Sequence, residues 1–214
     1  MIPARSGSSS PAGGGRNLFL VRHGETTGGS NLRFLGSTDV PLSREGCNQV
    51  RALVPLLAGI DPVALYHSPL ARAAQSLDIL VEALGWGGGR EGLHDLRELD
   101  FGACEGLTEA EIRREFPDFH TRWRSGGDYE AFPGGESLAA FSRRVGRATA
   151  AVLAAHPRGD LVLVVHKGVL RRILWHLFDR TEPALSRYDP PLASLTQVRE
   201  TPGLPPTWHG PRLP

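Results

Sequence analysis

Short apolar runs without helical periodicity alternate along the chain with longer segments whose apolar residues recur every three or four positions. The runs at 17–21 and 161–165 are almost wholly apolar, which is typical of strands buried on both faces. A run at 63–66 and a strand-like piece at 93–96 have a similar character. These four segments predict strands of one central sheet.

The segments between these runs each carry one apolar face, as helices packed on a sheet do. Two such faces follow the first and second runs, a long one begins at Leu138, and another directly follows the run at 161–165. Capping residues mark the predicted helix ends. These signals are Ser43, Ser68 followed by Pro69, Gly85, and the capping-box pair Thr108 and Glu111.

Strands that alternate with helices predict an α/β fold, here a three-layer α/β/α sandwich with a mostly parallel central sheet. We expect a single domain over 17–200, with an edge strand near 194–199. The polar, aromatic segment at 107–135 is predicted to be an excursion over the site that sets substrate specificity. The predicted tails are a flexible one at 1–16, rich in Gly and Ser, and a loose, proline-rich one at 201–214.

Composition excludes several classes of protein. The 214 residues carry a formal net charge of +1, so the basic excess of a nucleic-acid-binding protein is absent. No apolar run approaches the roughly 20 residues that span a bilayer, and residues 1–16 lack the apolar centre of a signal peptide. Cys47 and Cys104 have no metal-ligand spacing, so we interpret them as free thiols of a cytoplasmic protein.

In a parallel sheet, ligands bind beyond the carboxyl ends of the strands. That edge would collect Arg22 with His23, then Glu98 and His166, together with Arg72 one turn into a helix. Two guanidiniums and two imidazoles suit a dianionic phosphate. A histidine is a suitable nitrogen nucleophile near neutral pH, and a glutamate can donate a proton to a leaving alcohol.

Each of these residues also has a structural interpretation. A histidine after a strand is more often structural than catalytic, and Glu98 has the weakest case from the residues alone. His23 is the stronger candidate because Gly24, next to it, would allow a ligand to approach the backbone closely. The basic residues Arg143, Arg144 and Arg147 are interpreted as the solvated face of their helix.

Six motifs, in this order and with similar gaps, resemble the histidine phosphatase superfamily, also called the phosphoglycerate mutase-like family. The likeness extends over about residues 17–180. The motifs are RHGET at 22–26, GSTDVPLS at 36–43, SPLARAAQS at 68–76, LRELDFGACEG at 96–106, PGGES at 133–137 and VVHKGVLR at 164–171.

The resemblance implies roles for the candidate residues. His23 would be the phosphorylated nucleophile, and Glu98 would be the general acid and then the base for water. The phosphoryl oxygens would be bound by Arg22, Arg72 and His166. Arg33 matches an arginine that helps to hold the substrate phosphate in many members of the family.

The chain departs from the family pattern at two places. Gly28 and Gly29 replace a frequent Trp-Asn pair, and Lys167 replaces a glycine. Lys167 could bind a second anionic group of the substrate or turn outward, and we favour the outward orientation. Neither departure removes a residue with an expected role.

The expected activity is hydrolysis of a small phosphorylated metabolite through a phosphohistidine on His23, with no metal or organic cofactor. The short segment at 107–135 favours hydrolysis over mutase-type phosphoryl transfer, which usually accompanies a longer insertion there. A non-catalytic module that binds a phosphorylated ligand is a second alternative, and the intact set of five residues argues against it. We expect no nucleic-acid or membrane partner and leave a homodimer open.

Overall fold

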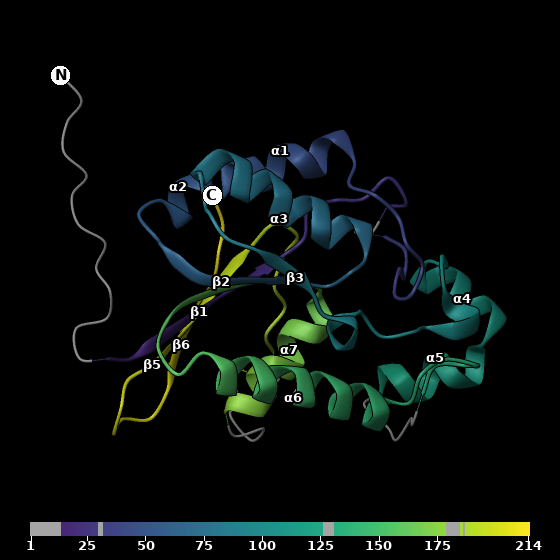
Figure 1. Cartoon of the computed structure of the whole chain (residues 1–214). Coiled ribbons are helices and arrows are strands. Elements are labelled where there is room, and N and C mark those ends of the chain that lie inside the picture. Colours follow the sequence, from purple (N-terminus) through teal and green to yellow (C-terminus); the bar gives the residue numbers. More distant parts are fainter. Residues whose placement is uncertain (1–13, 30–31, 126–130, 179–184, 186) are drawn as a thin grey trace.

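The computed structural model describes residues 14–29, 32–125, 131–178, 185 and 187–214. Its centre is a six-stranded sheet with the order β3-β2-β4-β1-β5-β6 (Figure 1). Strands β1 to β4 are mutually parallel, whereas β5 and β6 are antiparallel to their neighbours. The strands are β1 (Arg16–Arg22), β2 (Pro62–His67), β3 (Arg90–Gly92), β4 (Gly159–Val165), β5 (Leu195–Glu200) and β6 (Thr207–Arg212).

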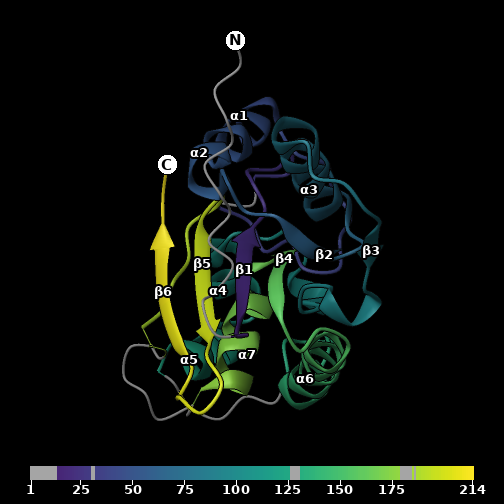
Figure 2. The same ribbon diagram turned by 60° about the vertical axis from the view of Figure 1, so that its left-hand side comes forward.

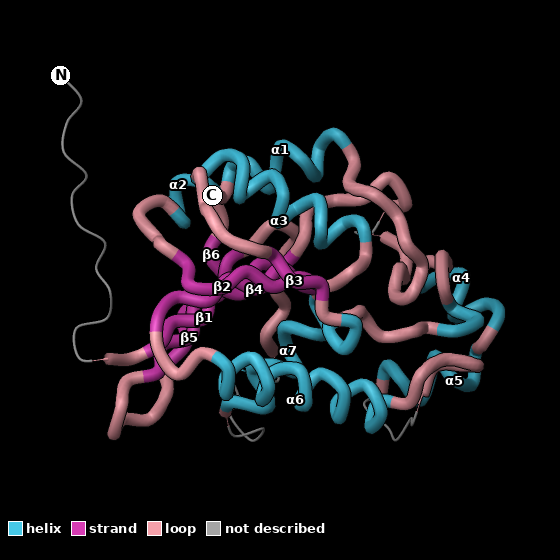
Figure 3. Tube along the Cα trace, viewed as in Figure 1, coloured by secondary structure: helices cyan, strands magenta, loops and turns pink. Residues whose placement is uncertain are grey.

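Helices cover both faces of the sheet, as the strand and helix periodicities predict. Helices α1, α2 and α3 lie over one face, and α6 and α7 lie over the other (Figure 3). Helices α4 and α5 pack together at one end of the molecule. The helices are α1 (Arg44–Ala52), α2 (Val54–Leu57), α3 (Ala71–Leu84), α4 (Glu109–Glu115), α5 (Pro117–Arg124), α6 (Leu138–Ala155) and α7 (Lys167–Leu177). The α/β sandwich expected from the sequence is confirmed.

The central strands β1 and β4 separate two apolar cores. Along β1, Leu18 and Leu20 belong to the core under α6 and α7, while Phe19 and Val21 belong to the core under α1 to α3. Side chains of β4 alternate in the same way. Because both faces are buried, these strands are apolar throughout, and this explains why their sequences show no alternation.

The C-terminal segment at 201–214 was wrongly expected to be a loose tail. Residues Thr207–Arg212 form β6, which pairs with β5 and is the outer strand of the sheet (Figure 2). Trp208 also packs against Tyr188 with ring centroids 5.1 Å apart. The strand predicted at 194–199 is β5, but it is not an edge strand, because β6 pairs with its outer side. At the other end, β1 begins at Arg16, and the rest of the expected tail, 1–13, lies outside the described residues.

Two local expectations need correction. The strand predicted at 93–96 is shifted, because β3 ends at Gly92 and residues His94–Leu96 form a 3-10 turn. Helix α3 begins at Ala71 with Leu70 at its N-cap, so Ser68 does not cap it. The segment at 107–135 contains α4 and α5, and its residues 126–130 lie outside the described residues.

Capping explains the helix starts that were predicted correctly. The Ser43 side chain accepts from the Gly46 N–H at the start of α1. Thr108 and Glu111 form the reciprocal capping box that opens α4. None of the helices in the described part of the chain is long and apolar enough to cross a bilayer.

Candidate active site

His23 and His166 meet where the parallel strands β1 and β4 end side by side. The register pairs Arg22 with Val165, so the residue after each strand lies at the same edge of the sheet. The two imidazole centroids are 5.0 Å apart, with an interplanar angle of 63°. Both side chains are buried, at 4% and 1% exposure. The topology thus brings together two histidines that are far apart in sequence.

Backbone contact fixes the tautomer of His23. Its Nδ1 lies 2.7 Å from the carbonyl oxygen of Gly24, and a carbonyl can only accept, so Nδ1 carries the proton. The lone pair of the neutral ring is then on Nε2. Burial lowers the pKa of His23 well below 6.5, and the charges of Arg72 and Arg22 lower it further. The ring is therefore a neutral nitrogen base near neutral pH.

Arg72 and His166 form a buried pair behind His23. The Arg72 Nε donates to the His166 Nδ1 at 3.3 Å, which leaves the His166 Nε2 to donate to the Ser68 Oγ at 2.7 Å. Burial lowers the pKa of His166 well below 6.5, followed by the charge of Arg72. Both rings at the site are thus uncharged beside fixed cations.

The Arg72 guanidinium also holds a loop in place. It donates to the carbonyl oxygens of Thr38 at 2.8 Å, Leu35 at 3.1 Å and Gly36 at 2.8 Å, and its side chain is fully buried. Neither Arg72 nor His166 lines the cavity at this edge of the sheet. Their expected contacts with a phosphoryl group therefore remain a prediction.

A cavity of about 830 Å³ opens at this edge of the sheet. The predicted site residues that line it are Arg22, His23, Arg33, Glu98 and Lys167. Arg22 donates through Nη1 to the Pro190 carbonyl at 2.7 Å, whereas its buried Nε has no hydrogen-bond partner among the described residues. A buried donor without a partner costs free energy that a bound anion would recover.

Glu98 is held by two backbone N–H groups. Leu99 donates to Oε1 at 2.9 Å, and Gly168, in the first turn of α7, donates to Oε2 at 2.8 Å. A Cβ on Gly168 would lie 2.4 Å from Oε1, so only glycine leaves room for the carboxyl group. Glu98 is 8% exposed and shares the cavity with His23. The arrangement places a carboxyl group and an imidazole in one pocket.

The remaining predicted residues lie around this centre in different ways. Lys167 lines the cavity, contrary to the outward orientation that we favoured, and its Nζ lies 2.5 Å from the Asp189 carboxylate. Arg33, at the mouth, donates to the Gly106 carbonyl at 2.7 Å and to Glu111 at 3.0 Å.

Gly24 has a packing reason to be glycine. A Cβ at this position would lie 2.4 Å from the carbonyl oxygen of Gly46 in α1. Gly24 is not among the residues that line the cavity. A helix of the same chain thus approaches Gly24 closely, and the expected approach of a ligand to its backbone remains a prediction.

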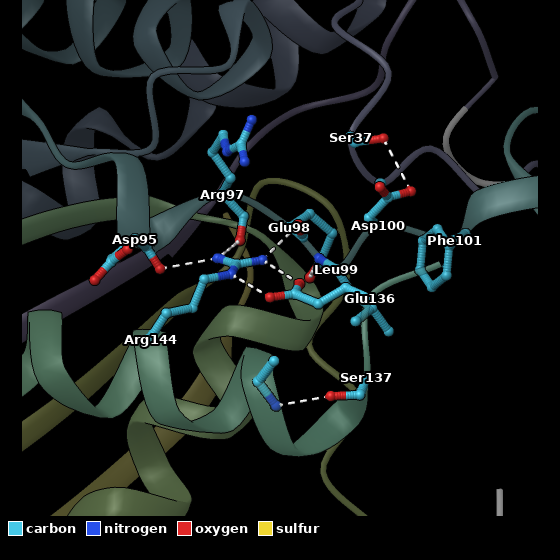
Figure 4. Close-up of polar contacts among 12 residues, drawn as sticks. Ser37, Asp95, Arg97, Glu98, Leu99, Asp100, Phe101, Glu136, Ser137 and Arg144 are labelled. Carbon is cyan, nitrogen blue, oxygen red and sulfur yellow. Dashed lines mark hydrogen bonds and ion pairs between the residues drawn. The ribbon is translucent and has the colours of Figure 1, made fainter. Parts of the chain in front are cut away.

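Sequence reasoning missed Arg144, which was expected on a solvated helix face. Its guanidinium binds both carboxylate oxygens of Glu136 at 2.8 Å (Figure 4). It also donates to the carbonyl oxygens of Asp95 at 2.9 Å, Arg97 at 2.6 Å and Glu98 at 2.9 Å. Arg144 therefore fixes the backbone that carries Glu98. The sequence offered one signal for this contact, because Arg144 follows Glu136 of the PGGES motif by 8 residues.

Sequence reasoning also missed an aromatic wall, defined here as Phe34, Phe101, Trp123 and Phe132. All four side chains line the cavity, and their rings contact one another at centroid distances of 4.8 to 5.9 Å. They come from separate segments, so no local sequence pattern marks them as a group. Only the aromatic content of 107–135 was visible beforehand.

Comparisons with known proteins identify the family of this chain. The family model described as "Histidine phosphatase superfamily (branch 1)" matches residues 18–206. The "Bifunctional protein Rv2228c" of Mycobacterium tuberculosis is 31% identical over 91% of this chain and 53% of its own length. The chain therefore spans about half the length of the first curated relatives that it matches.

Two further proteins show the range of named activities. A "2,3-bisphosphoglycerate-dependent phosphoglycerate mutase" of Azorhizobium caulinodans is 31% identical over 78% of this chain and 84% of its own. The solved structure of mycobacterial "glucosyl-3-phosphoglycerate phosphatase Rv2419c" superposes with a TM-score of 0.76 at 28% identity, covering 86% of this chain and 90% of that one. With the family model matched over nearly the whole described chain, this protein belongs to the histidine phosphatase superfamily.

Proposed function

We propose that this chain is a phosphomonoesterase that carries the phosphoryl group on Nε2 of His23. The observation that supports it most directly is the tautomer of His23, whose Nδ1 is tied to the Gly24 carbonyl while the ring stays neutral. The unpartnered Arg22 Nε and the Glu98 carboxyl group share the same cavity. Phosphoryl transfer mostly needs such positioning and charge stabilisation.

In the first step, the Nε2 lone pair of His23 attacks phosphorus, and the bond between phosphorus and the ester oxygen breaks. The proton of the Glu98 carboxyl group moves to that oxygen, so the alcohol leaves neutral. In the second step, water attacks the phosphohistidine, Glu98 takes the proton of the water, and the P–N bond breaks. Inorganic phosphate leaves, and both residues return to their starting states.

Mutase-type phosphoryl transfer is the second candidate, favoured by the similarity to a named phosphoglycerate mutase. Both reactions share the first step. We favour hydrolysis because the segment between Gly106 and Glu136 is short and contains only α4 and α5 among its described residues. A structural relative at 28% identity is also a named phosphatase. An assay with 3-phosphoglycerate separates the two candidates through the release of phosphate or the appearance of 2-phosphoglycerate.

The experiment that tests the proposal compares p-nitrophenyl phosphate hydrolysis by the wild type and His23→Ala between about pH 5 and 8. His209→Ala is the control, because His209 is exposed on β6. We expect activity in the wild type and the control and none in His23→Ala. Acid-labile phosphate trapped on the wild type and the control, but not on His23→Ala, would identify phosphohistidine. Equal activity in all three proteins would overturn the mechanism, and ligand binding without turnover would favour a non-catalytic module.

Three further expectations belong to this proposal. The chemistry uses protein side chains alone, so EDTA should leave activity intact, and a strict requirement for Mg²⁺ would contradict it. We propose a cytoplasmic location because the free thiols of Cys47 and Cys104 suit a reducing compartment. Sedimentation of the purified protein would decide between a monomer and a homodimer.

A further inference from the structure

The aromatic wall and the catalytic pair lie in one cavity. His23 and Glu98 line it together with Phe34, Phe101, Trp123 and Phe132. The volume of about 830 Å³ is near the upper end for ligand pockets and exceeds what a three-carbon phosphate ester would fill. The cavity therefore has room for a larger leaving group, and the aromatic wall is part of the surface open to it.

The rings of the wall pack against one another and against Phe119. Phe132 is buried at 4% exposure and contacts Phe34, Phe101 and Trp123 with centroid distances of 5.9, 4.8 and 5.8 Å. Phe119 of α5 stacks nearly parallel to Trp123, with an interplanar angle of 3°. Phe34, Phe101 and Trp123 are themselves only half-buried, so part of each ring remains uncovered. Preformed aromatic surface of this kind binds a planar apolar group at small entropic cost.

The charged groups on this side of the cavity are already paired with each other. Arg33 binds Glu111, and the Arg124 Nε lies 3.3 Å from the Glu109 carboxylate. A sugar rich in hydroxyl groups would have to compete with these ion pairs for its hydrogen bonds. An aromatic body would leave them intact.

We propose that the substrate is a phosphate monoester whose alcohol carries an aromatic or similarly planar apolar group, and that this group packs on the aromatic wall. This inference rests on the proposed function for the reaction, but the binding subsite can be tested without turnover. The phosphoryl group would lie against His23 and Arg22, and the ring would lie against Trp123 and Phe34. The class is thus distinct from small polar metabolites such as phosphoglycerate.

Binding of two phosphonates to the full chain tests the subsite. 3-Phenylpropylphosphonate is the non-hydrolysable isostere of 2-phenylethyl phosphate, and propylphosphonate is that of ethyl phosphate. We expect the phenyl compound to bind at least about tenfold more tightly by calorimetry, as burial of a phenyl ring on an aromatic surface implies. Equal affinities would overturn the inference whether or not the protein is an enzyme.

Variants locate the subsite. Trp123→Ala should abolish most of the difference between the two phosphonates, while its affinity for propylphosphonate stays close to that of the wild type. Arg122→Ala is the matched control, because Arg122 is exposed on the same helix and does not line the cavity. An undiminished preference in folded Trp123→Ala would show that the ring binds elsewhere. The wild-type comparison stands even if that variant does not fold.

Turnover separates this inference from the proposed function. Ethyl phosphate and 2-phenylethyl phosphate release similar primary alcohols, so their kcat/KM ratio reports binding of the ring more than leaving-group chemistry. A higher kcat/KM for the phenyl ester, lost in Trp123→Ala, would support the inference. His23-dependent hydrolysis of both esters at equal kcat/KM would overturn the inference and leave the phosphomonoesterase proposal standing.

Discussion

The amide of Gly168 donates to Oε2 of Glu98 at 2.8 Å, and the same glycine leaves the space that Oε1 occupies. This contact joins the first turn of α7 to the loop that carries the proposed acid. His166, the residue two positions before Gly168, lies beside His23. The spacing of the VVHKGVLR motif thus couples the position of the acid to that of the histidine pair.

Gly168→Ala should therefore displace Glu98. A Cβ 2.4 Å from Oε1 forces the carboxyl group to move, so proton transfer to the leaving oxygen becomes less efficient. We expect kcat/KM for an alkyl phosphate to fall by about tenfold or more. The value for p-nitrophenyl phosphate should fall less, because p-nitrophenolate leaves without a proton.

Gly146→Ala is the matched control for this substitution. Gly146 lies inside α6, and a Cβ there would meet its nearest neighbour, His176 Nδ1, at 3.5 Å, which is ordinary contact. Its kinetics should match the wild type for both substrates. If Gly168→Ala lowered both kcat/KM values equally, the loss would not arise from the acid.

Arg144 should be a positioning residue for Glu98. Removing its side chain leaves Glu136 without its bidentate partner and three loop carbonyls without a donor. For this largely buried pair we expect Arg144→Ala to cost about 3 kcal/mol in the free energy of unfolding. We also expect a lower kcat with a smaller change in KM, because the loop and not the phosphate contact is disturbed.

The control for Arg144 is its exposed neighbour, so Arg143→Ala should change neither stability nor kcat. Arg144→Lys should restore part of the stability but not the bidentate geometry. Unfolding in denaturant and steady-state kinetics with an alkyl phosphate measure both effects. A loss of stability in Arg144→Ala with unchanged kcat would show that the residue is purely structural.

The two buried histidines should make stability depend on pH. Because the folded-state pKa of each lies well below 6.5, the unfolded chain binds protons that the folded protein does not. Their contribution is complete above pH 6.5 and is lost as the pH falls from 6.5 toward the folded pKa values. Each histidine adds a slope of up to about 1.4 kcal/mol per pH unit in that window.

Denaturant unfolding at several pH values from about 7.5 to 5 measures this slope. His23→Asn removes one titrating group, so its stability should fall less steeply on acidification than that of the wild type. Hydrolysis should also persist below pH 6.5, because the nucleophile stays neutral there. Identical slopes for the two proteins would mean that His23 is not held neutral by its surroundings.

Sequence periodicity predicted the architecture because β1 and β4 are buried on both faces and the main helices present single apolar stripes. It also collected His23, Glu98 and His166 at one edge, since parallel strands end together. It failed where tertiary contacts decide the structure. Arg143 and Arg144 are adjacent arginines of one helix, and no local pattern distinguishes them. Only Arg144 binds Glu136 in the folded structure. The aromatic wall likewise depends on the packing of segments that are distant in the chain.

The outermost strand, β6, is another element that sequence patterns did not predict. Residues 201–214 contain five prolines, at 202, 205, 206, 211 and 214, yet Thr207–Arg212 pair with β5. Deleting residues 205–214 would expose the β5 edge and uncover Tyr188, which packs on Trp208. We expect a fall in Tm of about 5 °C or more and concentration-dependent association, measured by calorimetry and light scattering.

Truncation after Arg212 is the control, because it leaves β6 intact. If the longer truncation kept the wild-type Tm and associated no more than the wild type, β6 would contribute little to stability, as expected of a loose tail.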